Sequence, residues 1–137
     1  MPFEELDHTA DWSMRVWAPD LSRLFIDACK GMNALSGIRL AKGPRVARKI
    51  TASATDTVGL LVSFLSEIIY YNENKHLAFD HFAVELTIPK DQPCRLSAIL
   101  SGAPILNINK SIKAVTYHDL LIQPKDEGYE ARIVFDV

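Results

Sequence analysis

Three short polar segments in an otherwise apolar chain carry residues that could do chemistry. They are Asp7-His8-Thr9-Ala10-Asp11, Lys113-Ala114-Val115-Thr116-Tyr117-His118-Asp119 and Phe135-Asp136-Val137. The last segment places the Asp136 carboxylate beside the carboxylate of the chain's own final residue. Clustered carboxylates repel one another unless one is protonated or a cation lies between them. Hard oxygen ligands suit Ca²⁺, Mg²⁺ or Mn²⁺ rather than zinc, so the pattern predicts a divalent-cation site.

Each of these residues also has a purely structural interpretation. Asp11 could accept backbone hydrogen bonds in an Asx-turn, and His8 could be a structural histidine. Asp136 could be solvated at a fraying terminus. Residue types and spacing alone leave both interpretations open.

The segment from Lys113 to His118 alternates like a strand. Alternation places Lys113, Val115 and Tyr117 on one face, and His118 on the other face with Ala114 and Thr116. Lys113 could hold a phosphate or pair with an acid, and His118 could act as a base or orient another group, unless each is merely solvated. The sequence contains no Gly-rich phosphate loop, Cys-x-x-Cys, His-Glu-x-x-His or nucleophile elbow.

Composition indicates one ordinary globular domain spanning residues 1–137. The chain is 48% apolar and 23% charged with a formal net charge of −2, which gives no reason to expect broad binding to nucleic acid or anionic membranes. Its two cysteines, Cys29 and Cys94, match no metal-ligand spacing and are expected to be buried thiols in a reducing cytosol. The absence of a secretory signal or membrane-length apolar run favours a cytoplasmic location.

Two amphipathic helices are predicted to position these segments. Asp20 can cap a helix whose apolar residues recur from Leu21 to Leu35 at spacings of three and four, and Gly37 ends it. Asp56 can cap a second helix running from Thr57 to about Asn74.

The remaining chain reads as strands joined by short connections. Strands are expected around Met14 and Val16 and in the ranges 45–53, 79–88, 94–100, 112–117, 120–122 and 129–135, with an irregular loop over 102–110. Short turns require antiparallel neighbours. The predicted fold class is therefore α+β, with two helices packed on one face of a mostly antiparallel β-sheet as a two-layer sandwich.

Together these segments resemble the archease family. The matching stretches are His8–Asp11, the helix from Leu21 to Met32, Leu60–Ile69, Gly102, Ile112–His118 and Phe135–Val137, in the expected order along nearly the whole chain.

The resemblance implies a small accessory protein, not an enzyme, that activates the GTP-dependent (RtcB-type) RNA ligase of tRNA splicing and RNA repair. Such a protein promotes ligase guanylylation and multiple turnover, and meets RNA and GTP through the ligase. The implied metal ligands are Asp11, Asp136 and Val137, for Ca²⁺, Mg²⁺ or Mn²⁺. Lys113, His8 and His118 are candidate contacts to the partner or to phosphate.

The chain departs from the family pattern at Trp12-Ser13, at Ala18 and in a short 103–111 segment that lacks acidic and histidine residues. Two other functions remain open. One is a metal-dependent phosphoesterase with Asp11 and Asp136 as ligands and His118 as base. The other is a chaperone-like interaction module, which would expose a large apolar patch.

Overall fold

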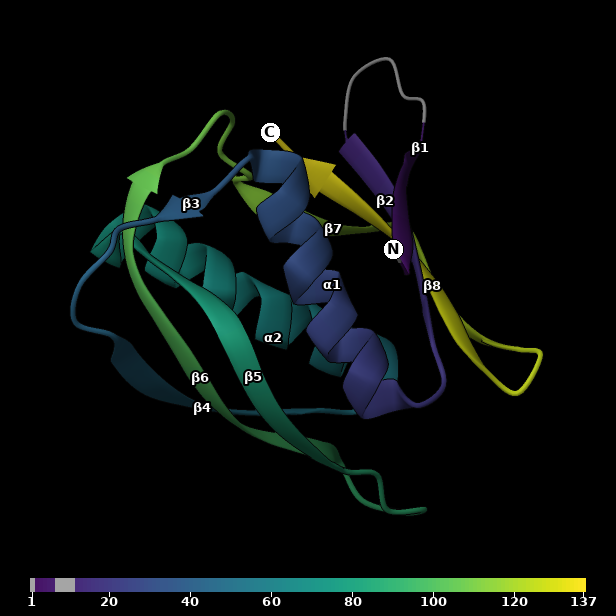
Figure 1. Ribbon diagram of the computed structural model, residues 1–137. Coiled ribbons are helices and arrows are strands. Elements are labelled where there is room, and N and C mark those ends of the chain that lie inside the picture. Colours follow the sequence, from purple (N-terminus) through teal and green to yellow (C-terminus); the bar gives the residue numbers. More distant parts are fainter. Residues whose placement is uncertain (1, 7–11) are drawn as a thin grey trace.

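The computed structural model describes residues 2–6 and 12–137 (Figure 1). Its elements are β1 (Phe3–Leu6), β2 (Trp12–Ala18), α1 (Leu21–Ser36), β3 (Arg39–Leu40), β4 (Val46–Ala54), α2 (Thr57–Tyr70), η1 (Tyr71–Lys75), β5 (Leu77–Thr87), β6 (Cys94–Asn107), β7 (Ala114–Lys125) and β8 (Gly128–Asp136). Neither α-helix in this part of the chain is long and apolar enough to cross a membrane.

Both helices begin where the sequence predicts. The Asp20 carboxylate accepts a hydrogen bond from the Arg23 N–H, and Gly37 closes α1 in the left-handed conformation that glycine adopts most easily. The Asp56 carboxylate accepts from the Gly59 N–H at the start of α2. The predicted second helix is confirmed, but its last turn widens into the π-helix η1.

The strands form two antiparallel groups, and this division was not evident from the sequence. One sheet has the order β1-β2-β8-β7, and in the other β6 pairs with β4, β5 and β3. Helix α1 contacts β2 and β5, while α2 contacts β4 and β7, so the helices lie between the two sheets (Figure 1). The α+β class with two helices and mostly antiparallel strands is confirmed, but the single sheet expected on one side of the helices is divided into two sheets, one on each side.

The core fills the space around the helices. The rings of Phe25 and Phe64 stack at a centroid distance of 6.0 Å, which joins α1 to α2. Met14, Ile133 and Phe135 line the inner face of the first sheet and have no exposed surface. Cys29 and Cys94 are free and buried, as expected. Burial, together with the nearby negative charge of Asp27, raises the pKa of the Cys29 thiol well above its ordinary value.

Two strand predictions differ from the structure. The loop expected over 102–110 is strand as far as Asn107, because β6 continues its pairing with β5 and β3. The two strands expected between Ile112 and Ile122 are one strand, β7, whose register shifts between Thr116 and Leu121. Asp119 takes a positive φ of 55° within this shift.

Replacing Asp56 with alanine is expected to lower the free energy of unfolding by about 1 kcal/mol, because the Gly59 N–H loses its acceptor. Asp56→Asn keeps an equivalent acceptor and should stay close to the parent chain. Urea denaturation of the three chains measures this difference. Equal losses in both variants would contradict the capping role.

The outer face of the first sheet carries an ion-pair network that makes stability depend on pH. Glu130 contacts Arg15 and Lys125, each at 3.2 Å. Burial alone would raise the pKa of Glu130, but Lys125 and Arg15 outweigh it and lower the pKa below the ordinary 4.5. The resulting stability is fully present above pH 4.5 and is lost as pH falls through the lower folded-state pKa.

Glu130→Gln is therefore expected to flatten the decline of unfolding free energy below pH 4.5. Urea denaturation across this range checks it, with Glu67→Gln on the exposed side of α2 as the control. An unchanged pH profile for Glu130→Gln would show that the network does not stabilise the fold.

Candidate functional site

Strand pairing brings the second and third polar segments to one end of the first sheet, together with Trp12. Trp12, the first residue after the Asp7–Asp11 segment, pairs with Phe135. On the other side of β8, Ala114 pairs with Asp136 and Val115 with Phe135. Residues separated by more than 120 positions in the sequence thus lie on neighbouring strands.

Asp136 combines a fixed backbone with an accessible side chain. Its carbonyl oxygen accepts a hydrogen bond from the Lys113 N–H at 2.8 Å. The preceding Phe135 is fully buried and anchors the end of β8, while Val137 is half-buried and packs against the core. The Asp136 side chain is exposed and is therefore available to a ligand.

The connection from β6 to β7 is held against the end of α1. The N–H groups of Asn109 and Lys110 both donate to the Ser36 carbonyl, at 2.9 and 3.2 Å. The Lys110 ammonium lies 5.7 Å from the centroid of the Trp12 ring. These contacts place exposed Lys113 in a connection fixed at both ends.

Trp12, Lys113 and Asp136 form what we call the Asp136 cluster. His118 is not part of it. It lies in the register shift of β7, is largely exposed and contacts the Asp119 carboxylate at 3.1 Å. The backbone N–H of His118 donates to the Thr116 hydroxyl at 3.3 Å. The strand position opposite Asp136 belongs to Ala114, four residues earlier.

His8 and Asp11 lie outside the described residues. Within residues 2–6 and 12–137, no group of three or more His, Cys, Asp or Glu side chains is arranged to hold a metal ion. The carboxylate of Asp136 and the backbone oxygen of Val137 are nonetheless the hard donors that Ca²⁺, Mg²⁺ and Mn²⁺ accept. The described donors fit such an ion in kind but require further ligands.

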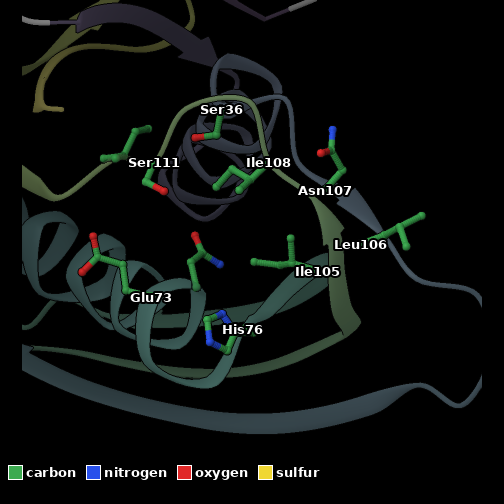
Figure 2. Close-up of a pocket in the computed structure, with 10 residues that line it drawn as sticks. Ser36, Glu73, His76, Ile105, Leu106, Asn107, Ile108 and Ser111 are labelled. Carbon is green, nitrogen blue, oxygen red and sulfur yellow. The ribbon is translucent and has the colours of Figure 1, made fainter.

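A groove of about 540 Å³ lies between the ends of α1 and β6 and the η1 segment (Figure 2). Figure 2 shows Ser36 and Ser111 across the groove from Glu73 of η1 and from His76, which follows η1. Ile112, which also lines the groove, directly precedes Lys113. The groove and the Asp136 cluster are therefore joined through one short segment.

The groove residues were not predicted as functional. The polar stretch Asn72–Lys75 reads as a helix stop, whereas the structure continues it as a π-helix that ends at His76 in a left-handed conformation. The Asn72 amide donates to the Leu77 carbonyl at 2.8 Å, which holds this turn in place. π-Helical turns within α-helices are frequent at functional sites, and no sequence signal marks this one at the end of α2.

Comparison with known proteins gives a consistent result. The protein-family model described as "Archease protein family (MTH1598/TM1083)" matches residues 3–137. The archease of Methanopyrus kandleri is 31% identical over 141 residues, covering 100% of both chains. The archease of Methanosarcina acetivorans is 29% identical over 140 residues, covering 98% of this chain and 95% of that protein.

Two solved structures share the fold. The solution structure of Methanobacterium thermoautotrophicum protein 1598 superposes with a TM-score of 0.79 at 26% identity and covers 99% of both chains. The crystal structure of an archease, "possible chaperone", from Thermotoga maritima gives a TM-score of 0.69 at 18% identity and covers 98% and 96%. With a family model matching almost its whole length, this chain belongs to the archease family.

Proposed function

We propose that this protein is an accessory factor that activates a GTP-dependent RNA ligase of the RtcB type, promoting ligase guanylylation and repeated turnover in tRNA splicing or RNA repair. Membership of the archease family supports the proposal. The observation that carries it is the strand register, which brings Trp12, Lys113 and Asp136 to one end of one sheet. A cytoplasmic location is part of this proposal.

The proposed ligands of a divalent cation are Asp11, Asp136 and Val137, the last through its backbone or terminal oxygen. When bound, the ion would supply positive charge against phosphate groups at the ligase active site. The protein's own part is to hold Asp136 in place, through the buried Phe135 side chain and the Lys113 hydrogen bond. Fixed donors lose little freedom on binding, which favours affinity.

Lys113 has the chemistry to contact phosphate. Its side chain is exposed, and its backbone N–H donates to the Asp136 carbonyl at 2.8 Å, so an ammonium and a carboxylate extend from two hydrogen-bonded residues. A lysine acts toward phosphate as a point charge.

Lys113→Ala is expected to lower ligase stimulation by roughly five- to tenfold, equivalent to about 1–1.4 kcal/mol of lost charge pairing. Initial rates of ligase guanylylation at fixed GTP measure the effect, and stimulation should weaken less in Lys113→Arg. Lys49→Ala, an exposed lysine on β4, is the matched control. Full stimulation by Lys113→Ala would remove Lys113 from the mechanism.

The described residues favour neither alternative function. His118 lies away from the strand position opposite Asp136 and pairs with Asp119, so nothing described places a base beside Asp136. Large exposed apolar side chains in the described part are distributed over several elements: Tyr70, Ile88, Ile99, Leu106, Tyr117 and Leu121. Singly exposed apolar residues are normal on soluble proteins and do not indicate a chaperone surface.

The test mixes purified protein, RtcB-type ligase, GTP, divalent cation and RNA with 3′-phosphate and 5′-hydroxyl ends. The proposal predicts faster ligase guanylylation and more ligated product per ligase molecule than with the ligase alone. A protein that leaves both quantities unchanged would overturn the proposal. A reaction without ligase serves as the control, and RNA cleavage or dephosphorylation there would favour a phosphoesterase.

A further inference from the structure

A second pocket lies far from the Asp136 cluster. It has a volume of about 760 Å³ and is bounded by the first half of α1, the end of β2 and the turn between β7 and β8. Figure 1 shows this turn and the C-terminus at opposite ends of β8. The aromatic side chains of Trp17 and Tyr129 contribute to its walls.

Asp27 places a buried carboxylate in this pocket with one oxygen unsatisfied. Its side chain is only 3% exposed, and its Oδ2 accepts from the Arg23 Nε at 3.3 Å. That nitrogen lies equally far from Oδ1, which accepts no hydrogen bond from any described residue. Charge-assisted bonds are normally about 2.7–2.9 Å, so Arg23 satisfies the carboxylate poorly.

Arg15 supplies a second unsatisfied atom to the same pocket. Its two terminal nitrogens contact Glu4 at 2.8 Å and Glu130 at 3.2 Å, and its guanidinium carbon lies 4.9 Å from the centroid of Trp17. Its Nε is buried and has no hydrogen-bond partner among the described residues. A buried polar atom without a partner costs about 1–3 kcal/mol.

The charge balance of the lining favours a cation. Four acidic and three basic side chains line the pocket. Each of the three basic side chains already contacts a carboxylate. Arg15 contacts Glu4 and Glu130. Arg23 contacts Asp27, and Lys125 contacts Glu130. Asp126 and Glu127, in the β7–β8 turn, form no ion pair with any other described residue.

We propose that this pocket binds an organic cation, an amine or guanidinium group, whose N–H donates to Asp27 Oδ1. The aliphatic part of the ligand packs against Trp17 and Tyr129, and in a peptide ligand a carbonyl oxygen accepts from the Arg15 Nε. Both a basic side chain of a partner protein and a free polyamine have this cationic chemistry. Arg23, whose side chain is 49% exposed, can move aside because the 3.3 Å contacts of its Nε with the Asp27 carboxylate are long for a charge-assisted bond.

The experiment uses N-acetyl-arginine amide as probe and N-acetyl-citrulline amide as its neutral counterpart of the same shape. In a Trp12→Phe chain, Trp17 is the sole indole, because the protein has only two tryptophans. The proposal predicts a saturable NMR shift of the Trp17 indole N–H with the arginine probe and at least about tenfold weaker binding of the citrulline probe. Equal binding of the arginine and citrulline probes, or no shift with either the arginine probe or spermidine, would overturn it.

A parallel titration with spermidine separates the two sources of the cation. Saturable binding of the arginine probe alone assigns the pocket to a basic side chain of a protein, and tighter binding of spermidine assigns it to a free polyamine. If neither cation binds, the proposal is wrong.

Two substitutions move the binding constant in opposite directions. Asp27→Asn removes the charge at constant shape and should weaken binding of the arginine probe at least about tenfold. Asp91→Asn, the control, lies exposed in the β5–β6 turn and should leave binding of this probe unchanged. Arg23→Gln removes the competing guanidinium and should strengthen binding, which keeps the test decisive if Asp27→Asn fails to fold. Unchanged or weaker binding by Arg23→Gln would contradict the role of Asp27. Asp136→Asn should leave probe binding unaltered, because it lies at the far end of β8.

Discussion

Asp136→Asn is expected to reduce stimulation of the RNA ligase by at least about tenfold, the scale on which weakened metal sites lose affinity or activity. An asparagine has nearly the same shape but no negative charge, so it is a poorer ligand for a hard divalent cation. Initial rates of ligase guanylylation, measured across a range of cation concentrations, give the effect.

The fold should survive this change. The Asp136 side chain is exposed, and the structural contact of this residue is its backbone carbonyl, which the substitution retains. Exposed substitutions of this kind usually change the free energy of unfolding by less than about 0.5 kcal/mol. Asp119→Asn, exposed on the neighbouring strand β7, removes the same charge and should retain stimulation. Equal activity of Asp136→Asn and the parent chain would exclude Asp136 from the site.

Gly102→Ala is expected to destabilise the second sheet strongly. A Cβ built at Gly102 would lie 1.8 Å from the Ala78 carbonyl oxygen and 2.7 Å from the Phe79 Cα, both backbone atoms of β5. Backbone atoms cannot move aside as a flexible side chain can, so β5 and β6 must separate. We expect a loss of about 3 kcal/mol or more in unfolding free energy, at or above the upper end of typical overpacking costs.

Urea denaturation of the Gly102→Ala and Leu106→Ala variants measures the loss of unfolding free energy in each. Leu106 lies on the same strand and is 66% exposed, so its truncation should cost less than about 0.5 kcal/mol. A Gly102→Ala chain as stable as Leu106→Ala would show that the two strands adapt without loss.

The local signals in the sequence predicted the helices well. Asp20 and Asp56 each accept the backbone hydrogen bond that their positions suggest, and Gly37 ends α1. These features depend on residues within one turn of one another, which is why sequence reasoning reaches them. The widening of α2 into η1 was missed because a polar run such as Asn72–Lys75 also fits a helix end.

The sheets were less predictable, since strand pairing depends on distant residues. Pro104 and Asn107 indicate a loop, yet β6 runs through Pro104 to Asn107 because β5 and β3 supply its partners. The division into two sheets likewise follows from which strands meet across the helices. No pattern within a single strand carries that information.

The candidate site, too, was only partly predictable from the sequence. Residue types marked Lys113 and Asp136 as chemistry-bearing but left a structural role open for each. The resemblance to the archease family related the polar segments to one another, and the pairing of β8 with β2 and β7 places Trp12 beside the two segments that the structure describes. Sequence reasoning offered no means of finding the groove at Glu73 and His76, because its walls come from three separate elements.

Paramagnetic NMR with Mn²⁺ tests most directly whether the end of the first sheet is a cation site. We predict that substoichiometric Mn²⁺ selectively broadens the backbone N–H signals of Trp12, Lys113 and Asp136, while those of Asp27 and Gly128 stay sharp. Asp136→Asn should remove this selective broadening. Broadening that is absent, centred on the groove at Glu73 and His76, or unchanged in Asp136→Asn would contradict the assignment of the cation site to Asp136.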